Sequence, residues 1–112
     1  MKTPLPGQAV RGSDSGRPIM AALDLFGRRG TLRIIWELRD GPLNFRALQD
    51  AADTNPAVLN TRLKELRAAG LVDHDEGGYR LTDLCVELQA LLMPLHAWAE
   101  RWALALRHDT AD

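Results

Sequence analysis

Residues 57–64 carry side chains that could hydrogen-bond to the bases and phosphates of a nucleic acid. On a helix, with about 100° between successive residues, the leucines at 59, 63 and 66 share one face and point toward a core. The opposite face and its flanks carry small, amide, hydroxyl and cationic groups: Ala57, Asn60, Thr61, Arg62 and Lys64. Asn and Thr can bond to base edges, Lys and Arg can bind phosphates or guanine, and Ala permits close approach. The alternative is an ordinary solvated helix face, with Glu65 as its acid.

Further arginines lie near the ends of neighbouring elements. They are Arg28 and Arg29 before one expected helix, Arg46 at the start of another, and Arg80 on the second strand of an expected hairpin. Each is a candidate phosphate contact, and each could equally be a surface charge that favours solubility. The hairpin tip, residues 73–76, is rich in acid and would repel DNA, so we expect a short hairpin that contributes little.

Length and composition indicate one globular domain. The chain has 112 residues, 46% hydrophobic and 26% charged, which is ordinary for a soluble domain. The net charge is −1, but the charges are distributed unevenly. Residues 18–70 hold eight basic and six acidic residues, whereas residues 71–112 hold three basic and eight acidic residues. We therefore expect the two halves to meet different partners.

Several classes of protein are excluded. No apolar stretch reaches the roughly 20 residues that span a bilayer, and residues 1–17 lack the apolar core of a secretory signal, so we expect a cytoplasmic protein without a membrane partner. Cys85 is the single cysteine and is expected to be a small core or interface residue. The chain has no phosphate-binding glycine loop, no nucleophile motif and no clustered metal ligands. The sequence predicts neither an enzyme nor a cofactor or metal site.

Capping and turn residues divide the chain into elements. Residues 1–17 are rich in Pro, Gly and Ser and are expected to be disordered. Helices are expected at 18–26, 32–40, 46–53, 56–69 and 83–107, a short strand at 43–45, and a hairpin formed by 71–74 and 79–81. Thr31, Asn55 and Thr82 are the expected N-caps, and Gly77 and Gly78 are expected to supply positive φ at the hairpin turn.

Two short helices followed at once by a hairpin are the layout of a winged helix-turn-helix. The predicted fold is mainly α with a small β-hairpin: a tail at 1–17, a winged helix-turn-helix DNA-binding domain at 18–82, and a long C-terminal dimerisation helix at 83–107. In this arrangement the second helix of the pair enters the major groove by its first turns. That helix is 56–69, where the polar and non-acidic residues lie.

The final helix carries a heptad pattern. Residues 84, 88, 91, 95, 98 and 102 are apolar at alternating spacings of four and three, which is the seam of a coiled coil. A helix over 83–107 runs roughly 37 Å, and Pro94 should bend it. The predicted dimer interface comprises Leu91, Leu95, Trp98, Trp102 and Leu106. The alternative is that residues 20–26 fold back and cover this row.

Residues 18 to about 102 resemble the HxlR-type transcriptional regulators, which are relatives of the MarR group. The resemblance rests on ALDLFG at 22–27, TLRIIWEL at 31–38, GPLNFRALQ at 41–49, LNTRLKELRAAGLV at 59–72 and YRLTD at 79–83, with LHAWAERW near the end. It implies a homodimeric bacterial regulator that binds an operator through the helix at 56–69. Arg17 stands where some members carry a sensing cysteine, Gly30 stands where the family has tryptophan, and the wing is shortened to HDEGGY.

The predicted function is sequence-specific binding of double-stranded DNA by a homodimer. Two recognition helices about 34–36 Å apart would meet successive major grooves, so the expected target is a short inverted repeat and the expected effect is repression. A small-molecule effector is left open. The alternative is a winged helix that has lost DNA binding and docks onto other proteins, which the acidic wing favours.

Overall fold

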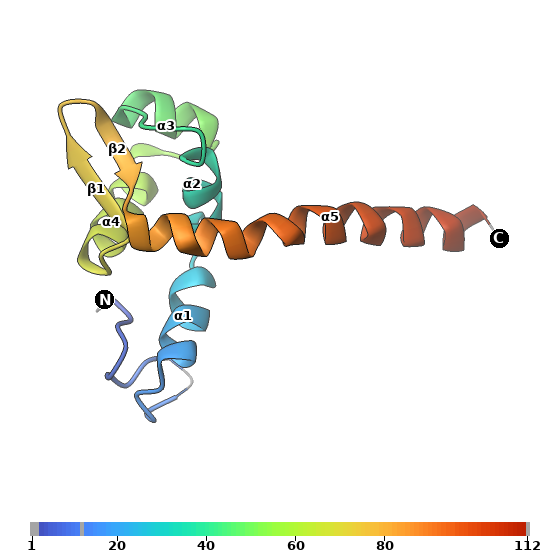
Figure 1. The fold of residues 1–112 in the computed structure, drawn as a ribbon, viewed down its shortest axis with the longest axis horizontal. Coiled ribbons are helices and arrows are strands. Elements are labelled where there is room, and N and C mark those ends of the chain that lie inside the picture. Colours follow the sequence, from blue (N-terminus) through green and yellow to red (C-terminus); the bar gives the residue numbers. More distant parts are fainter. Residues whose placement is uncertain (1–2, 12, 112) are drawn as a thin grey trace.

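The computed structural model describes residues 3–11 and 13–111, of which 108–111 are described by their backbone alone. Its elements are α1 (Pro18–Phe26), α2 (Thr31–Glu37), α3 (Phe45–Ala51), α4 (Pro56–Ala68), β1 (Val72–Asp75), β2 (Gly78–Leu81) and α5 (Asp83–Ala111) (Figure 1). The chain is mainly helical with a small antiparallel hairpin, as predicted. Helices α3 and α4 form the helix-turn-helix, and the hairpin forms the wing.

Asparagine caps begin both helices of the helix-turn-helix. The Asn44 side chain accepts a hydrogen bond from Ala47 N at 2.8 Å, and that of Asn55 accepts one from Val58 N at 2.9 Å. Pro56 then occupies the first turn of α4, where a missing N–H costs no helical bond. The predicted start of α4 is confirmed, and it fixes which residues fall in the first turns of this helix.

The start of α2 differs from the prediction. Gly30, with φ of 87°, is the N-cap, and no side chain caps this helix. Thr31 is the first helical residue and is fully buried, so the prediction that it caps α2 from outside is wrong. A left-handed residue turns the chain sharply into α2, and glycine adopts that conformation without steric cost.

The strand expected at 43–45 is a single bridge. Leu43 N donates to Tyr79 O at 3.0 Å, and Tyr79 N donates to Leu43 O at 2.8 Å. The pairing stops there because Asn44 already turns the chain into α3. This bridge passes so close to Gly78, which has φ of 113°, that a Cβ there would lie 2.6 Å from Leu43 O. Of the two turn glycines only Gly78 has positive φ, so the prediction for Gly77 is wrong.

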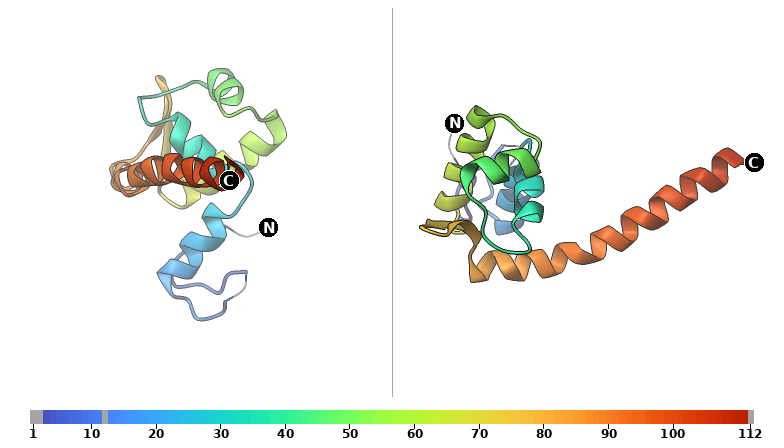
Figure 2. Two further views of the ribbon diagram at one scale, coloured as in Figure 1. Left: turned by 90° about the vertical axis from the view of Figure 1, so that its right-hand side faces the viewer. Right: turned by 90° about the horizontal axis from the view of Figure 1, so that it is seen from above.

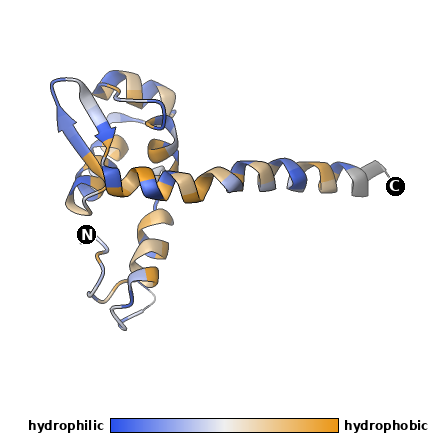
Figure 3. Cartoon of the chain, in the orientation of Figure 1, coloured by the Kyte–Doolittle hydropathy of each residue, from blue (hydrophilic) through white to orange (hydrophobic). Residues whose placement is uncertain are grey.

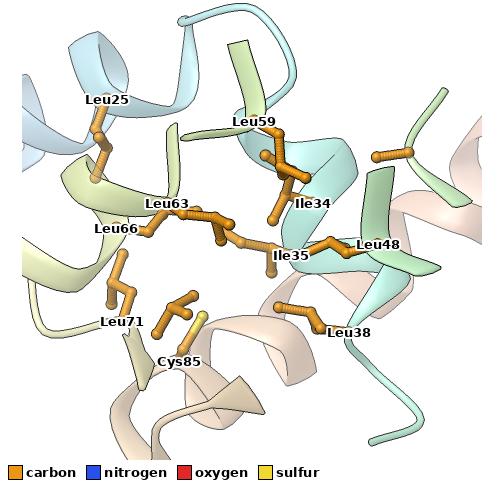
Figure 4. Close-up of a cluster of buried hydrophobic side chains, with 12 residues drawn as sticks. Leu25, Ile34, Ile35, Leu38, Leu48, Leu59, Leu63, Leu66, Leu71 and Cys85 are labelled. Atoms are coloured by element: carbon orange, nitrogen blue, oxygen red, sulfur yellow. The ribbon is translucent and has the colours of Figure 1, made fainter. Parts of the chain in front are cut away.

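A single core joins the helices to the wing. In Figure 4 the side chains of α2, α3 and α4 meet with those of the hairpin and the start of α5. Ile35, Leu48 and Leu59 are completely buried, and burial of each such side chain stabilises the fold by about 1.5–3 kcal/mol. Because α4 supplies Leu59, Leu63 and Leu66 to this core, its opposite side is fixed toward the outside.

Helix α5 begins in the core and then leaves it. Cys85 is buried, and Leu88 and Leu92 pack partly against the core, whereas the second half projects away from the domain (Figure 1). The helix contains Pro94 and curves along its length (Figure 2, right). It ends at Ala111, four residues beyond the predicted end at 107.

The N-terminal segment, residues 3–11 and 13–17, folds back beside α1. Gly7 N donates to Gly16 O at 3.0 Å, and Val10 and Ser13 form an isolated antiparallel bridge. Arg11 N donates to the carboxylate of Asp24 in α1 at 3.3 Å. The disorder predicted for residues 1–17 in solution stays a prediction.

Candidate nucleic-acid interface

The outward face of α4 is polar, exposed and without acid in its first turns. Ala57, Asn60, Thr61 and Lys64 are all exposed, while Leu59 on the opposite side is completely buried. Arg62 lies on the flank and is partly buried. The structure thus brings four of the sequence-predicted residues together on one accessible surface.

Two side chains on this face have hydrogen-bonding capacity left for a ligand. Thr61 Oγ1 donates to Ala57 O at 3.0 Å, which uses the hydroxyl proton and leaves the oxygen lone pairs free to accept. Within the described part of the chain, no hydrogen bond involves the Asn60 amide, so its donors and its acceptor face solvent. An amide of this kind can bond to the N6 and N7 edge of adenine.

A buried carboxylate lies just behind this face. Glu65, only 6% exposed, accepts from Arg62 Nη1 at 2.8 Å through one oxygen and pairs with Arg28 Nη1 through the other. Asp24 lies 3.8 Å from Arg28 Nη2. A buried charge is tolerated when it is paired and hydrogen-bonded, as here. The alternative reading of Glu65 as a solvated surface acid is wrong.

The ion cluster of Asp24, Arg28, Arg62 and Glu65 ties α4 to the end of α1. In addition, Arg62 Nε donates to the carbonyl oxygen of Arg29 at 2.7 Å. Arg28 and Arg62, two of the five arginines predicted from the sequence as DNA contacts, therefore have protein partners in the folded chain. The spacings of Arg62 and Glu65 (i, i+3) and of Asp24 and Arg28 (i, i+4) are the sequence signals that could have indicated parts of the cluster.

Arg29 and Arg46 remain at the surface. Both side chains are exposed, and neither pairs with a carboxylate among the described residues. Arg29 lies in the turn between α1 and α2, beside Arg62, whereas Arg46 lies in the first turn of α3. The two cations therefore flank the helix-turn-helix from different elements.

The wing is short, and its charges are partly satisfied within the hairpin. Arg80 pairs with Asp75 beside the turn, and the His74 ring stacks on Tyr79 with the ring centroids 4.0 Å apart. Asp73 and Glu76 are exposed, so the tip stays acidic. Arg80, the predicted wing contact, thus balances an acid of its own hairpin.

An open groove of about 760 Å³ borders the ion cluster. Its walls are the N-terminal segment, the end of α1 with the following turn, and the side of α4 that carries Thr61 and Lys64. The groove could not be predicted from the sequence, because it depends on how residues 3–11 fold back beside α1.

The thiol of Cys85 is expected to have low reactivity. Its side chain is completely buried in the core, and burial raises the pKa of the thiol from 9.0 to about 11. Since the thiolate is the reactive form, such a cysteine reacts slowly with oxidants and electrophiles near neutral pH. Its predicted place in a core is confirmed.

The residues that the structure describes contain neither a metal-binding cluster nor a membrane-spanning helix. No group of three His, Cys, Asp or Glu side chains is arranged to hold a metal ion. No helix in that part of the chain is both long enough and apolar enough to cross a bilayer.

Comparison with known proteins gives a consistent picture. Residues 25–106 match the model of a family described as HxlR-like helix-turn-helix. The uncharacterized HTH-type transcriptional regulator YvaP of Bacillus subtilis is 30% identical over 89 residues, which cover 72% of this chain and 82% of that protein. The uncharacterized HTH-type transcriptional regulator MJ0925 of Methanocaldococcus jannaschii is 25% identical over 88 residues, covering 74% of this chain and 83% of that protein.

Two solved structures of YodB from B. subtilis share the fold. The quinone-bound form matches with a TM-score of 0.69 and 32% identity, covering 74% of this chain and 96% of that one. The reduced form, described as a transcriptional regulator, matches with a TM-score of 0.66 and 30% identity, covering 74% and 89%.

Proposed function

This chain belongs to the HxlR-like helix-turn-helix family, and from that premise we propose that it represses transcription as a homodimer bound to a short inverted repeat. It is a DNA-binding transcriptional regulator and not an enzyme. We propose four further properties: an inverted-repeat operator, repression, a homodimer and a cytoplasmic location.

The observation that carries the proposal is the outward face of α4. An exposed surface of Ala57, Asn60, Thr61 and Lys64 at the start of the second helix of a helix-turn-helix is where base contacts are made in such proteins. We assign base contacts to Asn60 and Thr61, a phosphate or guanine contact to Lys64, and close approach to Ala57. Leucines behind the helix hold this face outward.

The cations around α4 take two different roles in the proposal. We assign phosphate contacts to Arg29 and Arg46, whose guanidinium groups are exposed. Arg28 and Arg62, held by Glu65, position α4 against α1 and add little net charge. Arg80 would reach DNA only by leaving Asp75, so the wing contributes weakly.

The second half of α5 supports the dimer. Trp98 is 48% exposed, Trp102 is 55% exposed, and their rings stack with centroids 5.5 Å apart. Leu91, 76% exposed, Leu95 and Leu106 are further exposed apolar residues of this half of the helix. Figure 3 shows hydrophobic residues recurring along α5 between hydrophilic ones. The alternative that residues 20–26 cover the row is wrong, because those tryptophans stay exposed. A twofold-related copy of the same surface is the simplest cover, since most soluble oligomers are symmetric.

The proposal is tested by selecting bound sequences from a random duplex pool with the purified protein. We expect enrichment of an inverted repeat whose half-sites are centred about 10–10.5 base pairs, or a multiple of that, apart. Enrichment of a single asymmetric site would contradict the dimer. Binding without any enrichment would contradict sequence-specific recognition.

A protein-interaction module is the second candidate, and the acidic wing tip favours it. The two candidates differ in how binding to random duplex depends on salt. A regulator that contacts phosphates binds nonspecifically at low salt and loses affinity steeply as salt rises. Absence of binding at about 50 mM salt would favour the interaction module.

A further inference from the structure

An aromatic contact joins the projecting half of α5 to the DNA-binding domain. Residues 93–102 of α5 are all exposed, yet the imidazole ring of His96 stacks on the indole ring of Trp36 in α2. The ring centroids lie 6.0 Å apart, and the ring planes differ by only 7°. Stacked aromatic pairs have centroid separations of about 4.5–7 Å. The stack therefore connects the exposed half of α5 to a helix of the core.

Trp36 is itself held in a fixed position. It directly follows Ile34 and Ile35, which are buried in the core. The guanidinium of Arg39 lies 4.5 Å from the centroid of the Trp36 ring, and Arg39 Nη1 donates to Trp36 O at 3.0 Å. A cation within about 6 Å of an indole centroid is attracted to the ring. The indole thus offers His96 a surface whose position is set by the domain.

The stack lies next to the weakest point of α5. Pro94, two residues before His96, has no N–H, so the helical hydrogen bond from residue 94 to the carbonyl of Ala90 is missing. Proline is a common cause of helix bending, and α5 curves along its length (Figure 2, right). Without a restraint, the part of α5 beyond Pro94 would change direction easily. The contact of His96 with Trp36 supplies that restraint.

A small change in this direction is comparable to the spacing of base pairs. From Pro94 to Trp102 the helix rises about 12 Å, at about 1.5 Å per residue. A change of about 20° at Pro94, the size of a proline kink, would shift Trp102 by about 4 Å relative to the domain. Successive base pairs are about 3.4 Å apart. In a dimer joined through Trp98 and Trp102, the direction of α5 therefore affects the separation of the two recognition helices.

We propose that His96 is a positioning residue: by stacking on Trp36 it fixes the direction of α5 beyond Pro94, and thereby sets the half-site spacing that the dimer accepts. The inference rests on the proposed function and adds a determinant of operator specificity outside the DNA-binding face. Base preference within each half-site belongs to α4. The distance between the half-sites belongs to the Trp36–His96 contact.

The test compares the sequences that the parent, His96→Ala, His96→Phe and Glu100→Ala select from a random duplex pool. The parent should enrich one half-site spacing. His96→Ala should keep the base preference but accept about three neighbouring spacings, with about a threefold loss of affinity for the parent's best site, because about a third of the molecules then have the matching conformation. His96→Phe keeps an aromatic ring and should retain the parent's spacing. Glu100→Ala, an exposed change on the same half of α5, is the matched control.

A double-mutant cycle tests the contact independently of DNA. The losses in unfolding free energy for Trp36→Ala and His96→Ala should sum to more than the loss in the double variant, because each single change removes the same interaction. An additive cycle would overturn the inference.

The remaining outcomes separate the positioning role from the proposed function. A single, unchanged spacing with His96→Ala, or equal broadening with Glu100→Ala, would overturn the inference while leaving DNA binding by α4 intact. Monomers of His96→Ala in sedimentation would overturn it as well, because His96 would then belong to the dimer interface. A parent that enriches no paired half-sites would overturn the proposed dimeric function and this inference together.

Discussion

At the scale of single residues, the interface is organised by which charges are already paired. Glu65 is the acid nearest to the recognition face, and its two arginine partners remove its repulsion of DNA. Asn60 and Lys64, by contrast, have no partner of this kind among the described residues. On α4, the flank with Arg62 and Glu65 thus stabilises the fold, and the face with Asn60 and Lys64 is accessible to a ligand.

Removing Glu65 should destabilise the fold through the charge that it leaves behind. In Glu65→Ala, the buried Arg28 loses its nearer carboxylate and keeps Asp24 at 3.8 Å. Breaking one side of a buried pair costs about 3–5 kcal/mol. Urea unfolding at fixed protein concentration measures this, with Glu87→Ala on exposed α5 surface as the control. A loss below about 1 kcal/mol, the value of a surface pair, would show that the cluster is not structurally important.

Cys85 should make stability depend on pH in the alkaline range. Its folded pKa of about 11 lies above the ordinary 9.0, so its contribution is complete below pH 9 and is lost as the pH rises toward 11. The full loss is roughly 3 kcal/mol. The difference in unfolding free energy between the parent and Cys85→Ala, followed from pH 8 to 11, isolates this effect. A difference that stays constant over that range would contradict the burial of the thiol.

At the scale of elements, α4 and the hairpin were predictable because local chemistry determines their ends. Asn55 and Pro56 begin α4, and the turn before the second strand follows from the adjacent glycines. The start of α2 was not predictable, because Thr31 is a good capping residue whose side chain is instead buried. Local spacing indicates the pairs within the ion cluster, but not the contacts of Arg28 with Glu65 and of Arg62 with Arg29, which join distant segments. The groove likewise depends on contacts between distant segments.

Substitution of Gly78 should destabilise the wing. A side chain there needs positive φ and clashes with the carbonyl of Leu43, so Gly78→Ala should cost about 1–3 kcal/mol or more. Gly77→Ala is the matched control, because its Cβ would meet only the Asp75 side chain at 3.3 Å. Thermal unfolding of both variants tests the difference. Equal midpoints would mean that the Leu43–Tyr79 bridge does not restrain the wing.

At the scale of the whole molecule, the two halves of α5 have different roles. Its first turns complete the core of the DNA-binding domain, and its second half extends outward to give the protein a longest dimension of 50 Å. The heptad spacing predicted this exposed row. Helix propensity alone did not predict that the helix would continue past residue 107 to Ala111.

Replacing both Trp98 and Trp102 by alanine should yield monomers. Together they provide the largest side chains of the exposed row, and burial of each is worth about 1.5–3 kcal/mol. Sedimentation measures the assembly state, with Val86→Ala, an exposed apolar residue on the first turns of α5, as the control. The tryptophan variant should also lose preference for paired half-sites. A dimer that persists would place the interface elsewhere.

The central claim, that the exposed face of α4 reads DNA bases, is tested most directly by parallel selections from one random duplex pool with the parent protein and Asn60→Ala. The substitution lies outside the core and should leave folding unchanged. We predict that the variant keeps the half-site spacing but loses preference at one or more base pairs in each half-site, at a cost of about 1–3 kcal/mol per position. Identical enriched sequences for the two proteins would contradict the account.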